Sequence, residues 1–193
     1  MQTTPGIAPL LSLCIALAMG GPSLRGAPPA EAPSATSRLP APRSRGDMSL
    51  QEALSQRRSR RQFASRALTP GEISQLLWAA QGITDPTGGR RTAPSAGATY
   101  PLVLYAVTSR GVHRYVPDGH RLEDHRTGDL RGLLADAALG QAALRQAPLI
   151  VVIASVRERT TRRYGARGEM YIHMEAGHAA QNLLLQAVAL NLA

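Results

Sequence analysis

The segment from Gly168 to Leu190 constrains the fold most, because it predicts a single long helix. At 1.5 Å per residue this helix would run about 33 Å, the width of a small domain. Its first part is polar, whereas its second part, AAQNLLLQAVALNLA, is apolar nearly all round. Because such a helix cannot leave its apolar sides in water, it belongs in a core or in a subunit interface.

Apolar runs before this helix predict the strands of a sheet. Residues 102–108 (LVLYAVT) read as a buried strand, and residues 149–154 (LIVVIA) as a strand covered on both faces. A hairpin is predicted for residues 112–116 and 121–123, which are joined by the turn sequence Pro-Asp-Gly-His. These runs place a hairpin between two buried strands.

Two capping boxes mark the starts of helices ahead of these strands. Ser49 and Glu52 form the first box, and Thr69 and Glu72 form the second, with proline at the first helical position. The second helix has apolar residues at three-and-four spacing and ends at Gly82. We also expect helical pieces over residues 129–134 and 141–146, and an arginine-rich connection over residues 157–168.

Composition limits the classes of function. The 193 residues include 22 arginines and no lysine, and the formal net charge is +9. This charge would permit binding to nucleic acid or to an acidic surface. However, an aromatic content of 4% gives little of the stacking platform that single-strand binders need, and we expect no nucleic-acid partner. Cys14 is the only cysteine, which excludes a disulfide or a cysteine-based zinc site within the chain.

The first 46 residues divide into two segments. Residues 1–20 contain an apolar run from Ile7 to Met19, too short for a transmembrane helix, and resemble a signal peptide. We therefore expect an exported, periplasmic protein, with an uncleaved membrane anchor or a misassigned start of a cytoplasmic protein as alternatives. Residues 21–46 are rich in Pro, Ala, Ser and Arg and predict a linker, so the folded domain covers residues 47–193.

Residues 57–63 (RRSRRQF) place four arginines and one hydroxyl within five positions at the end of the first helix. Arginine is well matched to phosphate, because its planar fork donates paired hydrogen bonds and stays charged. A single serine among the arginines suits a monophosphate. The alternative interpretation is a solvated basic turn.

Two further segments carry candidate residues. Residues 85–100 form a loop of small residues, which lets a backbone approach a flat ligand closely, and an ordinary connection is the alternative. In the long helix, His173, Glu175 and His178 suggest a metal site. No other segment supplies the second Glu-x-x-His that such a site needs, so we expect no metal and interpret these residues as polar groups of helix packing.

Together these segments resemble one family. Residues 57–63 resemble the RRSxRxF phosphate-binding motif of the flavin-dependent nitroreductases. Residues 94–101 (PSAGATYP) resemble the PSAGAxYP segment of the SagB/ThcOx-type dehydrogenase branch of that family. Residues 164–167 (YGAR) and 175–185 (EAGHAAQNLLL) resemble two further elements of the same branch. The matches occur in the order that the family shows and cover about residues 48–193.

This resemblance implies an α+β fold, a mixed central sheet flanked by helices, in a homodimer with FMN at the subunit interface. The flavin would exchange hydride with a small-molecule substrate, and NAD(P)H is the candidate electron donor. The phosphate of FMN would be held by Arg57, Ser59 and Arg61, and by Arg58 mainly through its backbone. The isoalloxazine ring would lie against Pro94, Ser95, Ala96 and Gly97.

The resemblance also names candidate catalytic residues. Azoline-oxidising members of the branch have a Lys-Tyr pair where this chain has Arg163 and Tyr164. Arginine does not readily release a proton, so Arg163 would stabilise negative charge while Tyr164 donates or relays a proton. Azole formation is therefore not expected.

The family pattern continues beyond the point at which this sequence stops. It includes a further strand and a segment that supplies another phosphate-contacting basic residue, whereas this chain stops at Ala193. The resemblance therefore predicts a fold that is incomplete at its C-terminus, with weakened FMN binding. A folded but non-catalytic relative of the family is the alternative.

Overall fold

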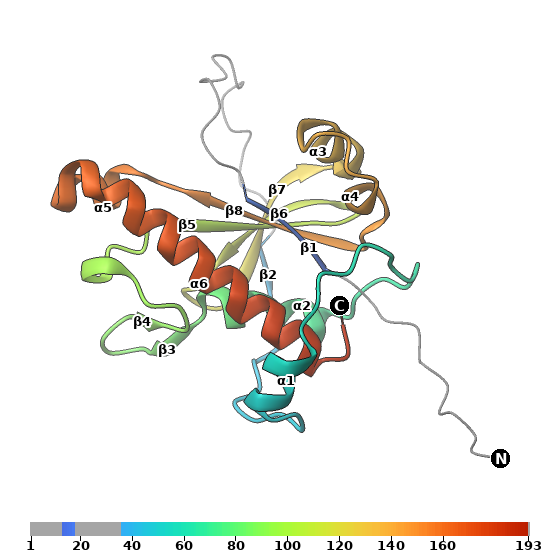
Figure 1. Ribbon diagram of the computed structural model, residues 1–193, viewed down its shortest axis with the longest axis horizontal. Helices are drawn as coiled ribbons and strands as arrows, with labels where there is room; N and C mark the ends of the chain where they lie inside the picture. The colour runs from blue at the N-terminus through green and yellow to red at the C-terminus, as the bar shows by residue number, and fades with distance from the viewer. Residues whose placement is uncertain (1–12, 18–35, 193) are drawn as a thin grey trace.

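The computed structural model describes residues 13–17 and 36–192, and their core is a six-stranded mixed sheet (Figure 1). The strand order is β1-β8-β5-β6-β7-β2. β1 runs parallel to β8, and all other neighbours pair antiparallel. In chain order the strands are β1 (Leu13–Leu17), β2 (Thr36–Arg38), β5 (Leu102–Val107), β6 (Gly111–Val116), β7 (Arg121–Thr127) and β8 (Leu149–Ser155).

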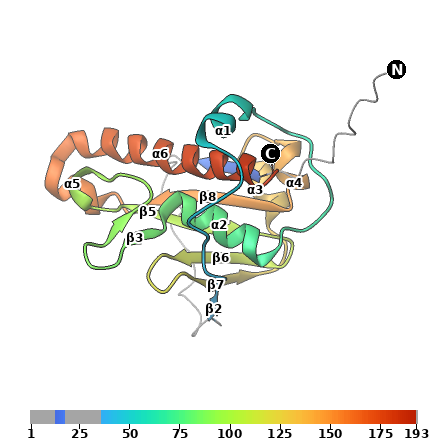
Figure 2. The ribbon, with the colours of Figure 1, turned by 90° about the horizontal axis from the view of Figure 1, so that it is seen from below.

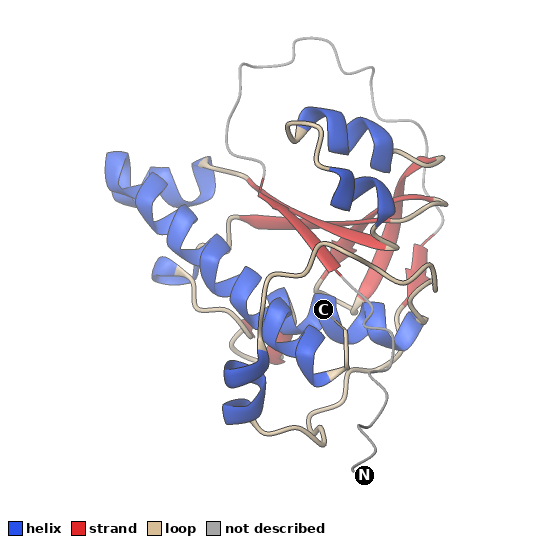
Figure 3. Cartoon of the chain, turned by 45° about the vertical axis from the view of Figure 1, so that its right-hand side comes forward, coloured by secondary structure: helices blue, strands red, loops and turns tan. Residues whose placement is uncertain are grey.

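Helices cover both faces of this sheet (Figure 3). One face packs against α2 (Pro70–Gln81) and α6 (Gly168–Ala189), and the other against α3 (Arg131–Ala137) and α4 (Ala142–Gln146). Along β8, Leu149, Val151 and Ile153 belong to the first core and Ile150 to the second. The prediction of a strand buried on both faces is therefore confirmed.

The two predicted capping boxes are both present. Ser49 begins α1 (Leu50–Gln56), where its hydroxyl accepts from the backbone N–H of Glu52 and the Glu52 carboxylate accepts from the backbone N–H of Ser49. Thr69 and Glu72 make the same reciprocal pair at the start of α2, which ends at Gly82 as predicted. Side chains of the sequence itself therefore fix where these helices begin.

α6 occupies the range predicted for the long helix. Its core-facing side carries Ile172, Ala176, Ala179 and Leu183, and the remaining residues of its second half are mostly half-buried. The residues before α6 differ from the predicted connection, because they form α5 (Glu158–Tyr164) and the short η2 (Gly165–Arg167). Arginine is a good helix former, and arginines in the last turn of α5 complement the helix dipole.

The loop predicted over residues 85–100 contains a small hairpin and one helical turn. β3 (Ile83–Asp85) pairs with β4 (Arg90–Arg91), and η1 (Ala96–Ala98) follows. The hairpin is short because the Thr-Gly-Gly turn reverses the chain within a few residues.

Residues 36–43, which we call the strap, differ from the linker expected over residues 21–46. β2 pairs with β7, and the backbone N–H of Leu39 donates to the carbonyl of His120 at 3.1 Å. The Ser74 hydroxyl donates to the carbonyl of Pro40 at 2.6 Å, and Gln75 bonds both backbone groups of Arg43. The strap is therefore fastened to α2 and to β7, and its own β2 is the edge strand on that side of the sheet.

The export prediction falls mostly on residues outside the described ranges. Of residues 1–20 the structure describes Leu13–Leu17, which form β1. None of the helices in the described ranges is both long enough and apolar enough to cross a membrane. Export and membrane contact stay predictions.

Candidate functional site

The predicted cofactor-binding residues lie in two places, near opposite ends of α6 (Figures 1 and 2). The arginine stretch follows α1, which lies beside the C-terminal end of α6, and η1 lies near α5 and the start of α6. Since α6 has 22 residues, it runs about 33 Å. One chain therefore does not bring the two segments together.

The arginine stretch presents several cations that no acid in the described part of the chain neutralises. Arg57 caps the end of α1 and is half-buried, whereas Arg60 and Arg61 are exposed. Within the described residues none of these three forms an ion pair. The Arg58 guanidinium donates from Nη1 to the carbonyls of Ser55 and Arg57, both at 2.8 Å. The side chain of Arg58 is thus engaged by the helix end, while its neighbours remain free to bind an anion.

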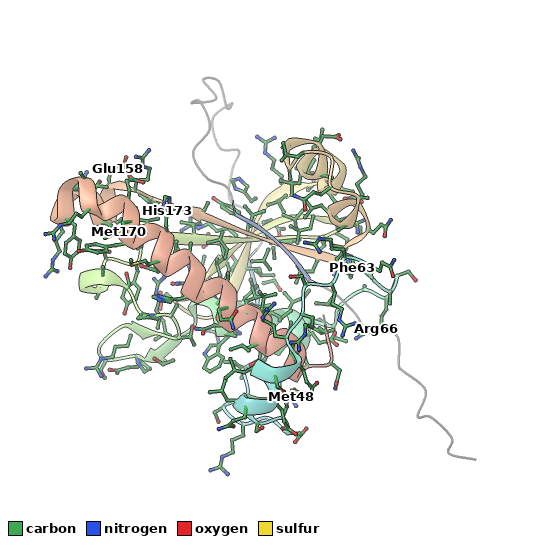
Figure 4. The ribbon with its side chains drawn as sticks, viewed as in Figure 1. Met48, Phe63, Arg66, Glu158, Met170 and His173 are labelled. Atoms are coloured by element: carbon green, nitrogen blue, oxygen red, sulfur yellow. The ribbon has the colours of Figure 1, made fainter. Side chains whose placement is uncertain are left out.

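The stretch is attached to the domain at both ends. α1 packs against α6 through its buried Ala53. Phe63 is half-buried and packs against the core beneath α3 and α4, on the side of the molecule where Figure 4 labels it. Phe63 is therefore an apolar anchor that fixes the path of the exposed arginines.

The loop of residues 94–100 is held in an unusual backbone conformation. Gly97, Ala98 and Tyr100 all have positive φ angles, of 57°, 53° and 43°. The Ser95 hydroxyl accepts from the backbone N–H of Tyr100 at 2.9 Å, and the Thr99 hydroxyl donates to the carbonyl of Ala96 at 3.0 Å. Left-handed alanine and tyrosine are costly and persist only where surroundings hold them, as often occurs at functional sites.

The structure brings the two predicted catalytic residues onto this loop. Arg163 Nη1 donates to the carbonyl of Gly97 at 3.2 Å. A Cβ atom built at Gly97 would lie 2.5 Å from the hydroxyl of Tyr164 and 2.9 Å from Cζ of Arg163. The Tyr164 ring meets Tyr171 of α6 edge to face, with centroids 5.0 Å apart. Glycine at position 97 therefore makes room for a guanidinium and a hydroxyl that lie side by side.

Behind the loop lies a buried polar cluster that the sequence analysis did not identify. It consists of Gln81, Arg91 and Glu175, and Arg91 Nη1 donates to Gln81 Oε1 at 2.8 Å. Glu175 is 3% exposed. Three atoms of the cluster (Gln81 Nε2, Arg91 Nε and Glu175 Oε1) are buried without a hydrogen-bond partner among the described residues.

Burial governs the electrostatics of this cluster. It raises the pKa of the Glu175 carboxyl, and the Ser95 hydroxyl, the Arg91 charge and the Gln81 amide offset part of that rise. Burial likewise lowers the pKa of Arg91, whose guanidinium lies 4.5 Å from the centroid of the Tyr100 ring. The cluster therefore connects α2 and α6 to the loop through Ser95 and Tyr100.

The sequence analysis interpreted Glu175 as a polar group of helix packing, and its position in the helix also indicates that it is buried. It occupies the same helical face as Ile172, Ala176 and Ala179, so it is a carboxyl in an otherwise apolar stripe. His173 and His178 are exposed, whereas Glu175 is buried. In the described part of the chain no three or more His, Cys, Asp or Glu residues are grouped so that they could hold a metal.

The comparisons with known proteins agree on one family. A model of the nitroreductase family matches residues 54–193. A proposed nitroreductase of Methanocaldococcus jannaschii is 43% identical over 152 residues, which are 76% of this chain and 76% of that protein. The family model spans both the arginine stretch and the loop of residues 94–100, and the two matches together identify the family.

Solved structures show the same fold. A proposed nitroreductase from Ralstonia eutropha JMP134 has a TM-score of 0.72 and 30% identity, with 98% of this chain and 80% of that chain covered. A proposed nitroreductase from Desulfovibrio desulfuricans, crystallised in complex with FMN, has a TM-score of 0.51 and 25% identity, with 75% and 64% covered. The predicted α+β nitroreductase-like fold is therefore confirmed, and the chain belongs to the nitroreductase family.

Proposed function

We propose that this protein is an FMN-dependent oxidoreductase of the SagB/ThcOx-type branch, acting on a small organic substrate. One observation carries this proposal. Three segments that resemble the branch meet in space, because Gly97 contacts Arg163 and Tyr164 while Ser95 lies beside Glu175. This convergence places the two proposed reacting side chains against the loop that is proposed to face the flavin.

The residues of the arginine stretch fit a phosphate group. Arg57, Arg60 and Arg61 carry charges that no acid among the described residues neutralises, and Ser59 is an exposed hydroxyl between them. In the proposed complex Arg57, Ser59 and Arg61 hold the phosphate through their side chains. Arg58 contributes its backbone, since its guanidinium already bonds the end of α1.

The residues of the loop fit a flat ring. Gly97 lies exposed in a left-handed turn, and Ala96 and Gly97 have no side chains large enough to keep a ring away. Pro94, Ser95, Ala96 and Gly97 therefore lie against the isoalloxazine in this proposal. Bound FMN would supply the hydride chemistry, and the protein would orient the ring and exclude water from it.

Arg163 and Tyr164 have different roles in the proposed reaction. The arginine keeps its proton, so it stabilises negative charge beside the loop. The Tyr164 hydroxyl donates or relays a proton to the substrate. We propose NAD(P)H as the electron donor on the resemblance alone.

A homodimer is part of the proposal, because one chain separates the phosphate segment from the loop along the length of α6. A second copy would supply the loop to the arginine stretch of the first. The outer side of α6 carries Met170 and Met174, which are 47% and 51% exposed, one helical turn apart. Burying these side chains against a second copy would stabilise the pair.

The absorbance spectrum of the purified full-length protein, recorded after FMN is added and excess is removed, tests the proposed function. We expect bound flavin in the wild type and its loss in the variants Arg57→Ala and Arg61→Ala. Arg110→Ala is the matched control, because it removes an exposed arginine of the hairpin loop between β5 and β6. A colourless wild-type protein would exclude the active-enzyme proposal.

A further inference from the structure

The pair formed by Arg163 and Tyr164 offers more donors than the loop uses. A guanidinium has five N–H donors, and the bond to the carbonyl of Gly97 engages one of them. Arg163 is exposed, and no carboxylate among the described residues forms an ion pair with it. The Tyr164 hydroxyl lies at the same place, as the close approach to Gly97 shows.

A second arginine of α5 also bonds a backbone carbonyl of the loop. Arg159 lies one turn before Arg163 on α5 and donates from Nη1 to the carbonyl of Tyr100 at 3.1 Å. By contrast Arg157, at the start of α5, is neutralised by Glu169 at 2.6 Å. Arg159 and Arg163 of α5 therefore both bind neutral carbonyls of the loop and keep their charge. Figure 4 shows this end of the molecule, with Glu158 on α5 and Met170 in the first turn of α6 labelled.

We propose that Arg163 and Tyr164 form a subsite for a carboxylate carried by the substrate. This inference rests on the proposed function, because it places the substrate beside the loop that would face the flavin. A planar guanidinium fork matches the two oxygens of a carboxylate. For a substrate of this class the Tyr164 hydroxyl adds a third donor to the carboxylate, and this binding role takes the place of the proton transfer proposed for Tyr164. The substrate class is then a small organic acid.

The geometry favours a carboxylate over a phosphate. Tyr171 packs edge to face against Tyr164, and Arg163 is held by the carbonyl of Gly97 and lies over the Tyr164 ring, 5.6 Å from its centroid, so the donors form one small set. The phosphate-like set of several arginines and a serine hydroxyl lies elsewhere, in residues 57–61. A phosphate on the electron donor is the other source of an oxyanion at this position, and the experiment separates the two.

The test is isothermal titration of the full-length, flavin-loaded protein with benzoate, with its neutral analogue benzamide and with inorganic phosphate. We expect benzoate to bind about tenfold tighter than benzamide, and Arg163→Gln to abolish that ratio. Arg163→Lys should keep part of the preference, because it retains the charge and loses the fork. Tyr164→Phe should weaken benzoate more than benzamide.

The matched control is Arg162→Gln, which removes the same charge from the adjacent, exposed position of α5. It should leave the benzoate-to-benzamide ratio unchanged, whereas an equal loss in both variants would show a long-range charge effect and overturn the subsite. A loosened loop would weaken both ligands alike, so the ratio separates binding from folding. The carboxylate subsite would also be overturned if Arg163→Gln weakened the binding of phosphate and left the binding of benzoate unchanged. Failure to load flavin contradicts the proposed function, whereas a loaded protein without benzoate preference contradicts only the subsite.

Discussion

At the scale of single residues, Glu175 is a carboxyl held where its charge is disfavoured. Burial raises its pKa above the ordinary value of 4.5 even though Arg91 lies nearby, so the direction already includes that attraction. As pH rises the unfolded state releases this proton first. The contribution of Glu175 to the free energy of unfolding is therefore greatest below the unfolded pKa and is lost as pH rises through the folded pKa.

We expect Glu175→Gln to remove this loss, because the amide has the shape of the protonated carboxyl. The variant and the wild type should unfold at the same temperature at about pH 4, and the variant should unfold at the higher temperature at about pH 8. Thermal unfolding at several pH values measures this. Glu158→Gln, the same change at an exposed position of α5, should not alter the pH dependence. If the variant instead unfolds at a lower temperature than the wild type at about pH 8, the charged carboxylate of Glu175 stabilises the protein through Arg91.

Gly97 offers a second test at this scale. Gly97→Ala should lower the free energy of unfolding by the cost of a left-handed alanine, about 1–2 kcal/mol, and should also displace Tyr164 and Arg163. Gly89→Ala is the matched control, since its φ is 63° and its Cβ would meet nothing within 4 Å. Urea unfolding compares the two. If both variants lose the same free energy of unfolding, the contacts of Gly97 with Tyr164 and Arg163 do not contribute to stability.

The contacts of these residues explain how far the sequence predicted the site. Motif resemblance pointed to Gly97, Arg163 and Tyr164 one by one, but the bond from Arg163 to Gly97 spans 66 residues. Gln81 and Glu175 lie still farther apart along the chain, on two different helices. No local pattern encodes which buried polar side chains will meet, because that depends on how the two helices pack.

At the scale of elements, the sequence was most informative where one element stabilises itself. Both capping boxes involve residues three positions apart, so they could be read directly. The strap could not, because its bonds to Gln75 and Ser74 join residues 32 and 34 positions apart. Its Pro- and Arg-rich composition predicted a linker, and distant partners on α2 outweighed that local preference.

Thr69→Ala tests the cap of α2. The hydroxyl accepts the N–H of Glu72 at 3.2 Å, and Glu72 also pairs with Arg66 at 2.7 Å, so the change should lower the free energy of unfolding by about 1 kcal/mol. Ser49→Ala removes the equivalent bond from α1, whose only buried residue is Ala53. We expect a smaller loss there, measured by urea unfolding. A larger loss at Ser49 would contradict the view that α2 is the more integral helix.

At the scale of the whole molecule, the proposed homodimer makes a prediction about α6. Met174→Glu places a charge on its exposed outer side and should convert dimer to monomer, with loss of bound flavin. Leu139→Glu is the matched control, because Leu139 is 95% exposed in the α3–α4 connection. Analytical ultracentrifugation measures the mass of each variant. A wild-type monomer that still retains flavin would contradict a site shared between two copies.

The strap has a consequence for solubility. β2 pairs with Arg121, Leu122 and Glu123 of β7, so removing everything before Met48 would leave the outer backbone N–H and C=O groups of this part of β7 without that partner. An uncovered strand edge is a template for pairing with another chain. The three residues of β2 thus protect this part of β7 from pairing with another chain, a role that their composition does not predict.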